Sequence, residues 1–145
     1  MAGTGSNKTD PIEIAAKALR HGDRSRHEID ERLARAGIDE EERAESLATL
    51  ERLGYVDDNR FAVDRAGTLA GRGYGDAYIV FDLEQHGADA DSIASAVAEL
   101  VPERVRAQEL AARFGSTVKT AAQLARKGFA DDSLEGIIAR DGDVP

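Results

Sequence analysis

The sequence repeats itself at a spacing that favours a row of small helical units. When residues 25–47 are shifted by fifty positions, six residues that mark helix ends or apolar faces superimpose without a gap. Ser25, Ile29, Leu33, Gly37, Asp39 and Leu47 fall on Gly75, Ile79, Leu83, Gly87, Asp89 and Val97. A further shift of forty-one reaches residues 116–138, where the agreement in residue type is weaker. Units this small cannot bury an apolar face alone, so we expect them to stack on one another.

Helix-capping patterns divide each unit into three helices. Asp10-Pro11 predicts the first helix start, a capping box of Ser25 with Glu28 predicts the second, and Gly37 predicts a helix end. The apolar stripes at helical spacing are Ile12, Ala15, Ala16 and Leu19; Ile29, Leu33 and Ala36; Leu47, Leu50 and Leu53; and, in the third unit, Val105, Leu110, Ala111 and Phe114.

These patterns predict an all-α fold of three tandem three-helix repeats in an elongated, curved array. The predicted boundaries are a disordered tail at 1–10, repeats at 11–54, 55–101 and 102–140, and a second tail at 141–145. With 5% aromatic and 32% charged residues, the composition favours helices that pack through small side chains.

The charge distribution argues against a general nucleic-acid binder. The chain carries 19 Lys and Arg against 28 Asp and Glu, a formal net charge of −9, whereas such binders gain affinity by neutralising phosphates. Basic residues nevertheless gather at 12–37 and 104–128, and the excess acid lies mainly at 38–58 and 129–145. A molecule polarised in this way suits contact with two kinds of partner surface.

Residue types and spacings give no support to an enzyme or a metalloprotein. The sequence has no Cys, which excludes disulfides and thiolate catalysis. His21, His27 and His86 are not at a metal-binding spacing, and no Ser-His-acid pattern stands out. We therefore expect no catalysis, no cofactor and no metal. The first ten residues lack the apolar core of a signal peptide and no apolar run is long enough to span a membrane, so we expect a cytoplasmic protein.

The joint between the first two units lies at residues 54–62, which read Gly-Tyr-Val-Asp-Asp-Asn-Arg-Phe-Ala. Gly54 suits the positive φ of a helix end. Tyr55–Val56 should form a short apolar anchor, and Asp57–Asn59 should accept hydrogen bonds from the free N–H groups of the next helix. Phe61 should begin the buried face of that helix.

This string resembles the Gly-Tyr-hydrophobic-Asp-Asp-x-Arg-Phe-Ala signature of the RecX family, small bacterial proteins that regulate the RecA recombinase. The segments Arg24-Ser25-Arg26-x-Glu28-Ile29 and Leu33-x-x-x-Gly37 resemble the first repeat of that family, and Gly73-x-Gly75 resembles the second. The resemblance covers residues 15–140. It implies a helical-repeat protein that lies in the groove of a RecA–DNA filament and inhibits strand exchange, ATP hydrolysis and co-protease activity. The low isoelectric point departs from the more basic members, and this argues against direct DNA binding more than against recombinase binding.

Most of the residues predicted to bind a partner are basic residues of the two end units, and Arg72 at the tip of a glycine-rich loop is added to them. They are Arg20, Arg24, Arg26, Arg32, Arg72, Arg104, Arg106, Arg113, Lys119, Arg126 and Lys127. The expected partner is the RecA filament, with at most weak contact to DNA, no membrane and a monomeric state. The alternative is a helix-turn-helix-like DNA-binding transcription regulator, because each unit joins two short helices by a tight turn. An enzyme is the third hypothesis.

Overall fold

The computed structural model describes residues 10–142, with side chains described as far as residue 137. Those residues form nine α-helices and contain no strand, so the predicted all-α class is confirmed. The helices are α2 (Pro11–Leu19), α3 (Arg26–Arg35), α4 (Glu40–Arg52), α5 (Asp58–Gly71), α6 (Asp76–Gln85), α7 (Ala90–Ala98), α8 (Glu103–Phe114), α9 (Val118–Arg126) and α10 (Asp131–Gly142). Of the predicted tails, residues 1–9 and 143–145 lie outside the described residues. The others belong to helical structure: Asp10 caps α2, and α10 extends to Gly142.

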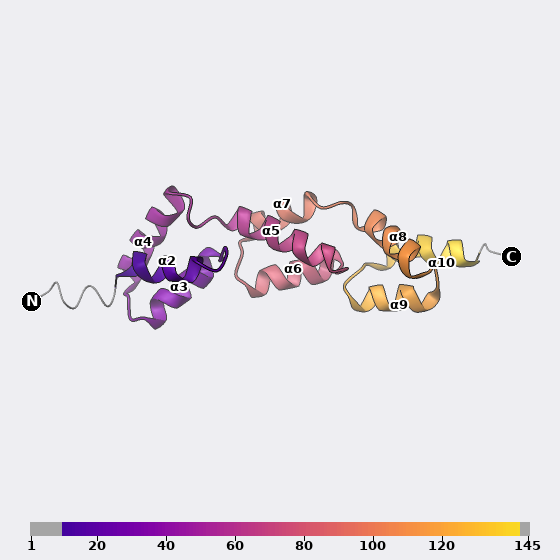
Figure 1. The fold of residues 1–145 in the computed structure, drawn as a ribbon, viewed down its shortest axis with the longest axis horizontal. Helices are drawn as coiled ribbons and strands as arrows, with labels where there is room; N and C mark the ends of the chain where they lie inside the picture. Colours follow the sequence, from indigo (N-terminus) through magenta and orange to yellow (C-terminus); the bar gives the residue numbers. More distant parts are fainter. Residues whose placement is uncertain (1–9, 143–145) are drawn as a thin grey trace, which may run out of the picture.

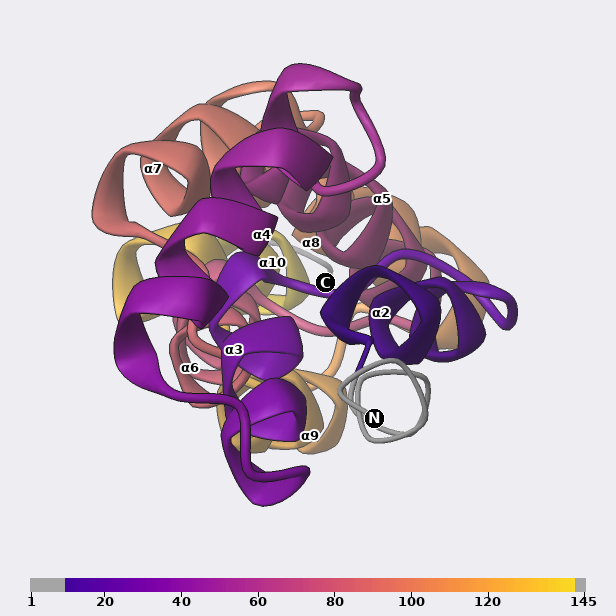
Figure 2. The same cartoon turned by 90° about the vertical axis from the view of Figure 1, so that its left-hand side faces the viewer.

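The helices follow one another along an elongated row, with the two described ends of the chain at opposite ends (Figure 1). They pack in three successive groups: group 1 is α2–α4, group 2 is α5–α7 and group 3 is α8–α10. Every extensive helix–helix contact joins two helices of the same group. Viewed from the N-terminal end, the groups lie one behind another, with α3, α6 and α9 on the same lower side (Figure 2).

Each group surrounds a buried cluster of its own. The cluster of group 1 contains Ile29 and Leu33, that of group 2 contains Ile79 and Leu83, and that of group 3 contains Leu124. These residues superimpose under the shifts that define the sequence repeat. The boundaries of the predicted units stay a prediction. Val56, which lies in the predicted second unit, packs into the cluster of group 1.

Local capping patterns predict the helix ends well. Ser25 Oγ accepts a hydrogen bond from the N–H of Glu28 at 3.1 Å, and the Glu28 carboxylate accepts one from the N–H of Ser25 at 3.0 Å. Gly37 ends α3 with a φ of 88°, and Gly54 follows α4 with a φ of 82°. Asp39 caps α4 by accepting from the N–H of Glu42.

Several residues of the predicted apolar stripes are exposed. They are Ile12, Ala16, Ala36, Leu53, Val105 and Phe114, and Tyr55 of the predicted anchor is exposed as well. In α2 the buried face is centred on Ala15 and Ala18, which turns Ile12 toward solvent. Leu53 is the C-cap of α4 and Tyr55 follows the reversal at Gly54, so both project outward. The predicted anchor therefore consists of Val56 alone, which is 1% exposed whereas Tyr55 is 61% exposed.

The joint between groups 1 and 2 is tied by the carboxylate of Asp58. One oxygen accepts from the N–H of Arg26, at the start of α3, at 2.7 Å, and the other accepts from the N–H of Asp89, at the start of α7, at 3.2 Å. The prediction that Asp58 caps its own helix is wrong, because Asp57 holds that position and accepts from the N–H of Arg60. Burial raises the pKa of Asp58 above its ordinary value.

The joint between groups 2 and 3 repeats this arrangement with Glu103. Its carboxylate accepts from the N–H of Asp76, at the start of α6, at 2.7 Å. It also accepts from the N–H of Ala130 at 3.1 Å and from the hydroxyl of Ser133 at 2.6 Å, both beside the start of α10. We call Asp58 and Glu103 the joint carboxylates. Each begins the first helix of its group and reaches back to the second helix of the preceding group.

The second helices of neighbouring groups also meet end to end. The N–H of Gly75, before α6, donates to the carbonyl of Lys127, after α9, at 2.8 Å, and the N–H of Ala77 donates to the carbonyl of Gly128 at 3.2 Å. At the first joint the hydroxyl of Ser25 donates to the carbonyl of His86. In the sequence repeat, Gly75 corresponds to Ser25. The hydroxyl donor of Ser25 at the first joint is therefore replaced by the backbone N–H donor of Gly75 at the second.

An ion pair inside group 2 makes a testable contribution to stability. Arg65 donates two hydrogen bonds to the carboxylate of Asp82, at 2.7 and 2.9 Å, and this pairing holds the pKa of Asp82 below its ordinary value of 3.8. An acid with a lowered folded-state pKa stabilises the fold above its unfolded-state pKa and loses that contribution as the pH falls through the folded-state value. We therefore expect acidification below about pH 4 to weaken the parent protein through this pair.

Replacing Asp82 by Asn should remove that pH-dependent contribution. We expect Asp82→Asn to lower the free energy of unfolding at neutral pH by about 1.5 kcal/mol and to flatten its dependence on pH below about pH 4. Urea unfolding across a pH series measures both. Glu84→Gln is the control, since Glu84 is an exposed acid of the same helix. Equal acid sensitivity of Asp82→Asn and the parent would contradict the prediction.

Candidate functional site

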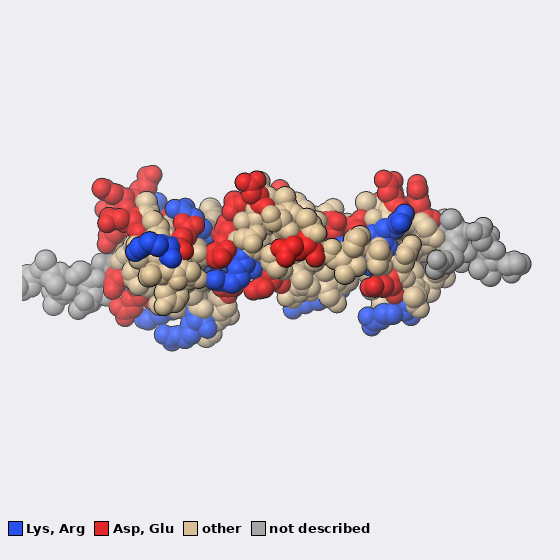
Figure 3. Space-filling view, turned by 90° about the horizontal axis from the view of Figure 1, so that it is seen from above, with Lys and Arg blue, Asp and Glu red and all other residues tan. Residues whose placement is uncertain are grey.

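The structure distributes the eleven predicted basic residues over all three groups. Group 1 carries Arg20, Arg24, Arg26 and Arg32, and group 3 carries Arg104, Arg106, Arg113, Lys119, Arg126 and Lys127; Arg72 is the C-cap of α5 in group 2. Seen from above, basic side chains project from one long edge over each group, whereas acidic clusters stand on the opposite edge (Figure 3).

Arg106 is buried and is committed to the joint between groups 2 and 3. Only 8% of the residue is exposed, and its guanidinium forms an ion pair with Asp76 at 2.9 Å. It also donates to the carbonyls of Tyr74 at 3.0 Å and Val101 at 3.1 Å. Residue 106 stands on the inner face of α8, one position before the fully buried Ala107. We therefore leave Arg106 out of the partner-binding surface.

Lys127 is also engaged at this joint. Its ammonium donates to the carbonyl of Arg72 at 2.9 Å and lies 4.5 Å from the ring centroid of Tyr74, a cation–π distance. The charge of Lys127 thus fixes the loop at residues 71–73 against the end of α9.

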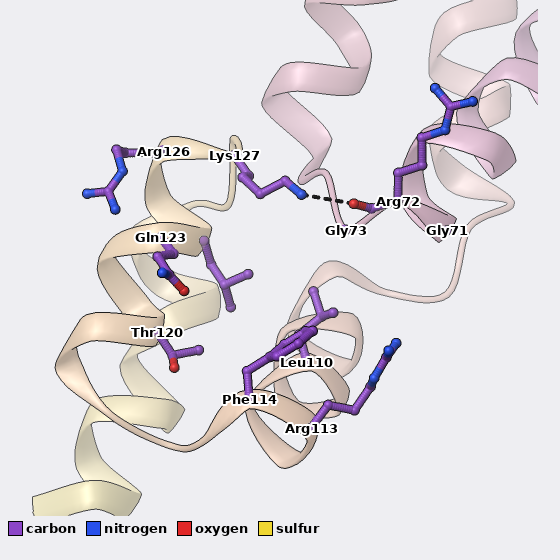
Figure 4. A pocket seen from close by; sticks show the side chains of 11 residues that line it. Gly71, Arg72, Gly73, Leu110, Arg113, Phe114, Thr120, Gln123, Arg126 and Lys127 are labelled. Atoms are coloured by element: carbon purple, nitrogen blue, oxygen red, sulfur yellow. Dashed lines mark hydrogen bonds between the residues drawn. The ribbon is translucent and has the colours of Figure 1, made fainter.

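A groove of about 540 Å³ lies beside this joint, between the loop at residues 71–73, α8 and α9 (Figure 4). We call it the group 3 groove. Its apolar lining is Leu110, Phe114 and Leu124, its polar lining is Thr120 and Gln123, and its basic lining is Arg72, Arg113, Arg126 and Lys127. Among the described residues, no acidic side chain lines it. The groove therefore brings together four predicted residues from two groups, a convergence that sequence distance does not reveal.

The basic residues of group 1 have different surroundings. Arg24 and Arg32 line a smaller hollow of about 120 Å³ that also contains Glu28 and Glu31. Arg26 pairs with Glu51 at 3.1 Å on the exposed surface. Acidic side chains therefore interleave with these cations. The remaining predicted residues, Arg20, Arg104 and Lys119, are exposed and line neither hollow.

Comparison with known proteins decides the family. No protein-family model matches the chain. The regulatory protein RecX of Stenotrophomonas maltophilia strain R551-3 is 32% identical over 143 residues, which cover 92% of this chain and 88% of that protein. The chain belongs to the RecX family. The resemblance based on residues 54–62 is thereby confirmed.

Further RecX proteins agree in sequence and in fold. RecX of Xanthomonas axonopodis pv. citri strain 306 is 31% identical over 134 residues, 86% of this chain and 83% of that protein. The crystal structure of RecX from Lactobacillus salivarius superimposes with a TM-score of 0.80 over 97% of this chain and 99% of that one, at 21% identity. A second RecX crystal structure gives a TM-score of 0.75 over 93% of this chain and 74% of that one. The all-helical fold is therefore that of RecX.

The name of these relatives describes regulation, and this member of the RecX family is accordingly a regulatory protein. Within residues 10–142, no helix combines the length and the apolar character that crossing a bilayer requires.

Proposed function

We propose that this RecX protein binds the RecA filament and restrains its recombinase, ATPase and co-protease activities. Membership of the RecX family supports this proposal. The observation that carries it is the separation of exposed cations: Arg20 and Arg32 lie on group 1, and Arg104 and Lys119 lie on group 3, at opposite ends of an elongated row (Figure 1).

Cations at two ends of one row suit an extended acidic surface, such as that of a filament loaded with DNA. A contact at either end is weak alone, because salt screens exposed charges. Once one end has bound, the other is held close to the same surface, so the two contacts together give much higher affinity. Bound along the filament in this way, the protein would obstruct the surfaces that strand exchange and substrate cleavage require.

Charge reversal at each end tests the proposal. We expect Arg20→Glu/Arg32→Glu and Arg104→Glu/Lys119→Glu each to weaken filament binding at least about tenfold, a loss of about 1.4 kcal/mol. Each should also reduce the salt dependence of the affinity, because fewer ionic contacts form. Helix content should be unchanged, since exposed charges contribute little to folding. The measurement is binding to RecA filaments on single-stranded DNA across a salt series, beside filament-dependent ATP hydrolysis and circular dichroism.

The matched control is Lys17→Glu/Arg52→Glu, which changes the net charge equally at two exposed positions outside the predicted set. It should bind nearly as well as the parent. If both end variants bind as tightly as the parent, the bivalent contact is wrong. If the parent instead binds duplex DNA with sequence preference and ignores the filament, the transcription-regulator alternative replaces the proposal.

A further inference from the structure

We infer that the group 3 groove is a docking site for a short acidic peptide of a protein partner, with an apolar side chain between acidic ones. This inference goes beyond the proposed function, since the groove and its chemistry require neither a recombinase nor DNA.

The two walls of the groove carry separate cations. Arg113 projects from α8 and Arg126 from α9, and they lie on opposite sides of the groove, with Leu110 and Phe114 between them (Figure 4). Neither arginine forms an ion pair with any described residue. Arg113 instead stands 5.2 Å from the ring centroid of Phe114. A peptide lying across the groove would thus meet a cation, an apolar floor and a second cation in succession.

The apolar floor presents one large exposed ring to an occupant. Phe114 is 63% exposed at the end of α8, beside the partly buried Leu110. Covering a phenylalanine ring with another apolar side chain stabilises a complex by removing both surfaces from water. The amide of Gln123, which also lines the groove, supplies a donor and an acceptor for a peptide backbone.

The charge of the lining residues determines which charge the bound peptide must carry. Lys127 already donates to the carbonyl of Arg72 and contacts Tyr74, yet its charge remains uncompensated by any acidic lining residue. With Arg113 and Arg126 it makes the groove positive on a chain whose net charge is −9. Carboxylates fit such a site, because Arg forms strong charge-assisted hydrogen bonds with them.

A peptide fits these features better than a nucleic acid. Single strands are bound by tracks of cations and by successive aromatic platforms on which the bases stack. Phe114 is the only aromatic side chain among the described residues that line the groove, and its neighbours Leu110 and Leu124 are aliphatic. The volume of about 540 Å³ suits a few residues rather than a long strand.

The test uses a fluorescein-labelled peptide in which one phenylalanine stands between two pairs of glutamates. We expect saturable binding to the full chain. Arg113→Glu/Arg126→Glu should weaken it at least about tenfold, and exchanging the phenylalanine of the peptide for serine should do the same. Phe114→Ser should also weaken binding while leaving helix content unchanged, because the ring is mostly exposed. Fluorescence anisotropy and circular dichroism measure these effects.

The matched control is Arg104→Glu/Lys119→Glu, a double reversal on the same two helices at exposed positions outside the groove. It should retain peptide affinity within about twofold while losing filament affinity. A failure of the groove inference can therefore be distinguished from a failure of the filament proposal. The inference is overturned if the parent shows no saturable binding or if the control loses as much affinity as the groove variant. It is also overturned if a single-stranded oligonucleotide binds more tightly than the peptide with the same dependence on Arg113 and Arg126.

Discussion

Gly75→Ala is expected to force groups 2 and 3 apart and to lower the free energy of unfolding by about 3 kcal/mol. A Cβ atom at residue 75 would lie 2.4 Å from the backbone carbon of Gly128 and 2.4 Å from the backbone nitrogen of Phe129. Backbone atoms cannot move aside as the end of a flexible side chain can. The φ of Gly75 is −86°, which alanine adopts freely, so the whole effect comes from lack of space.

Gly67→Ala is the control for this variant. Gly67 lies within α5, where an added Cβ meets nothing within 4 Å. Alanine should therefore raise the free energy of unfolding by roughly 0.5–1 kcal/mol, because it restricts the unfolded chain. Urea unfolding followed by far-UV circular dichroism compares the variants. An unfolding midpoint of Gly75→Ala at or above that of the parent would show that the close approach of α6 to α9 is unimportant for stability.

Glu103→Ala is expected to lower the free energy of unfolding by a similar amount, on the order of 3 kcal/mol, because one carboxylate accepts from three donors. Its loss removes the bond to the start of α6 and both bonds beside the start of α10. Since the groups share no extensive helix–helix contact, group 3 should then unfold at a lower urea concentration than groups 1 and 2. The unfolding curve of Glu103→Ala should show two steps, and that of the parent should show one.

Glu109→Ala is the matched control, an exposed glutamate on the same helix. Its effect should stay within about 0.5 kcal/mol. Glu103→Gln should recover only part of the lost stability, because one acceptor oxygen is replaced by a donor group that faces donors. A single unfolding step for Glu103→Ala, at the same urea concentration as for Glu109→Ala, would rule out a role for this carboxylate in joining the groups.

The helix ends could be predicted from the sequence, because capping partners lie within a few residues of each other. Ser25 and Glu28 are three positions apart, and both of their hydrogen bonds form. The joints could not be predicted in this way, since Asp58 meets a residue 32 positions away and Glu103 one 27 positions away. A signal for Glu103 nevertheless existed. Laying residues 57–62 over residues 102–107 places Asp58 on Glu103 and Ala62 on Ala107.

The residues of the candidate site could be predicted only in part, because spacing along the sequence does not specify contacts between the groups. The partner-binding residues are predicted from clusters of basic residues along the sequence, which carry no information on burial, so the buried Arg106 is grouped with the exposed Arg104. Helical spacing assigns Phe114 to a buried stripe, although α8 ends there and Gly115 redirects the chain. The contact of Arg72 with Lys127 depends on how groups 2 and 3 are joined. No spacing within one unit specifies that geometry.

The separation of the groups has a mechanical consequence. Bending a continuous helical bundle deforms many side-chain contacts at once, whereas bending this chain at a joint, which would act as a pivot, would deform only the contacts between two groups. At each pivot the joint carboxylate acts together with the other hydrogen bonds between the groups, such as Ser25 to His86 at the first and Arg106 to Asp76 at the second, and group 2 separates the two pivots. With the described ends at opposite ends of the row, a small rotation at either pivot is amplified into a large displacement at the tip (Figure 1). A dye pair near Pro11 and Ile137 would report that displacement directly.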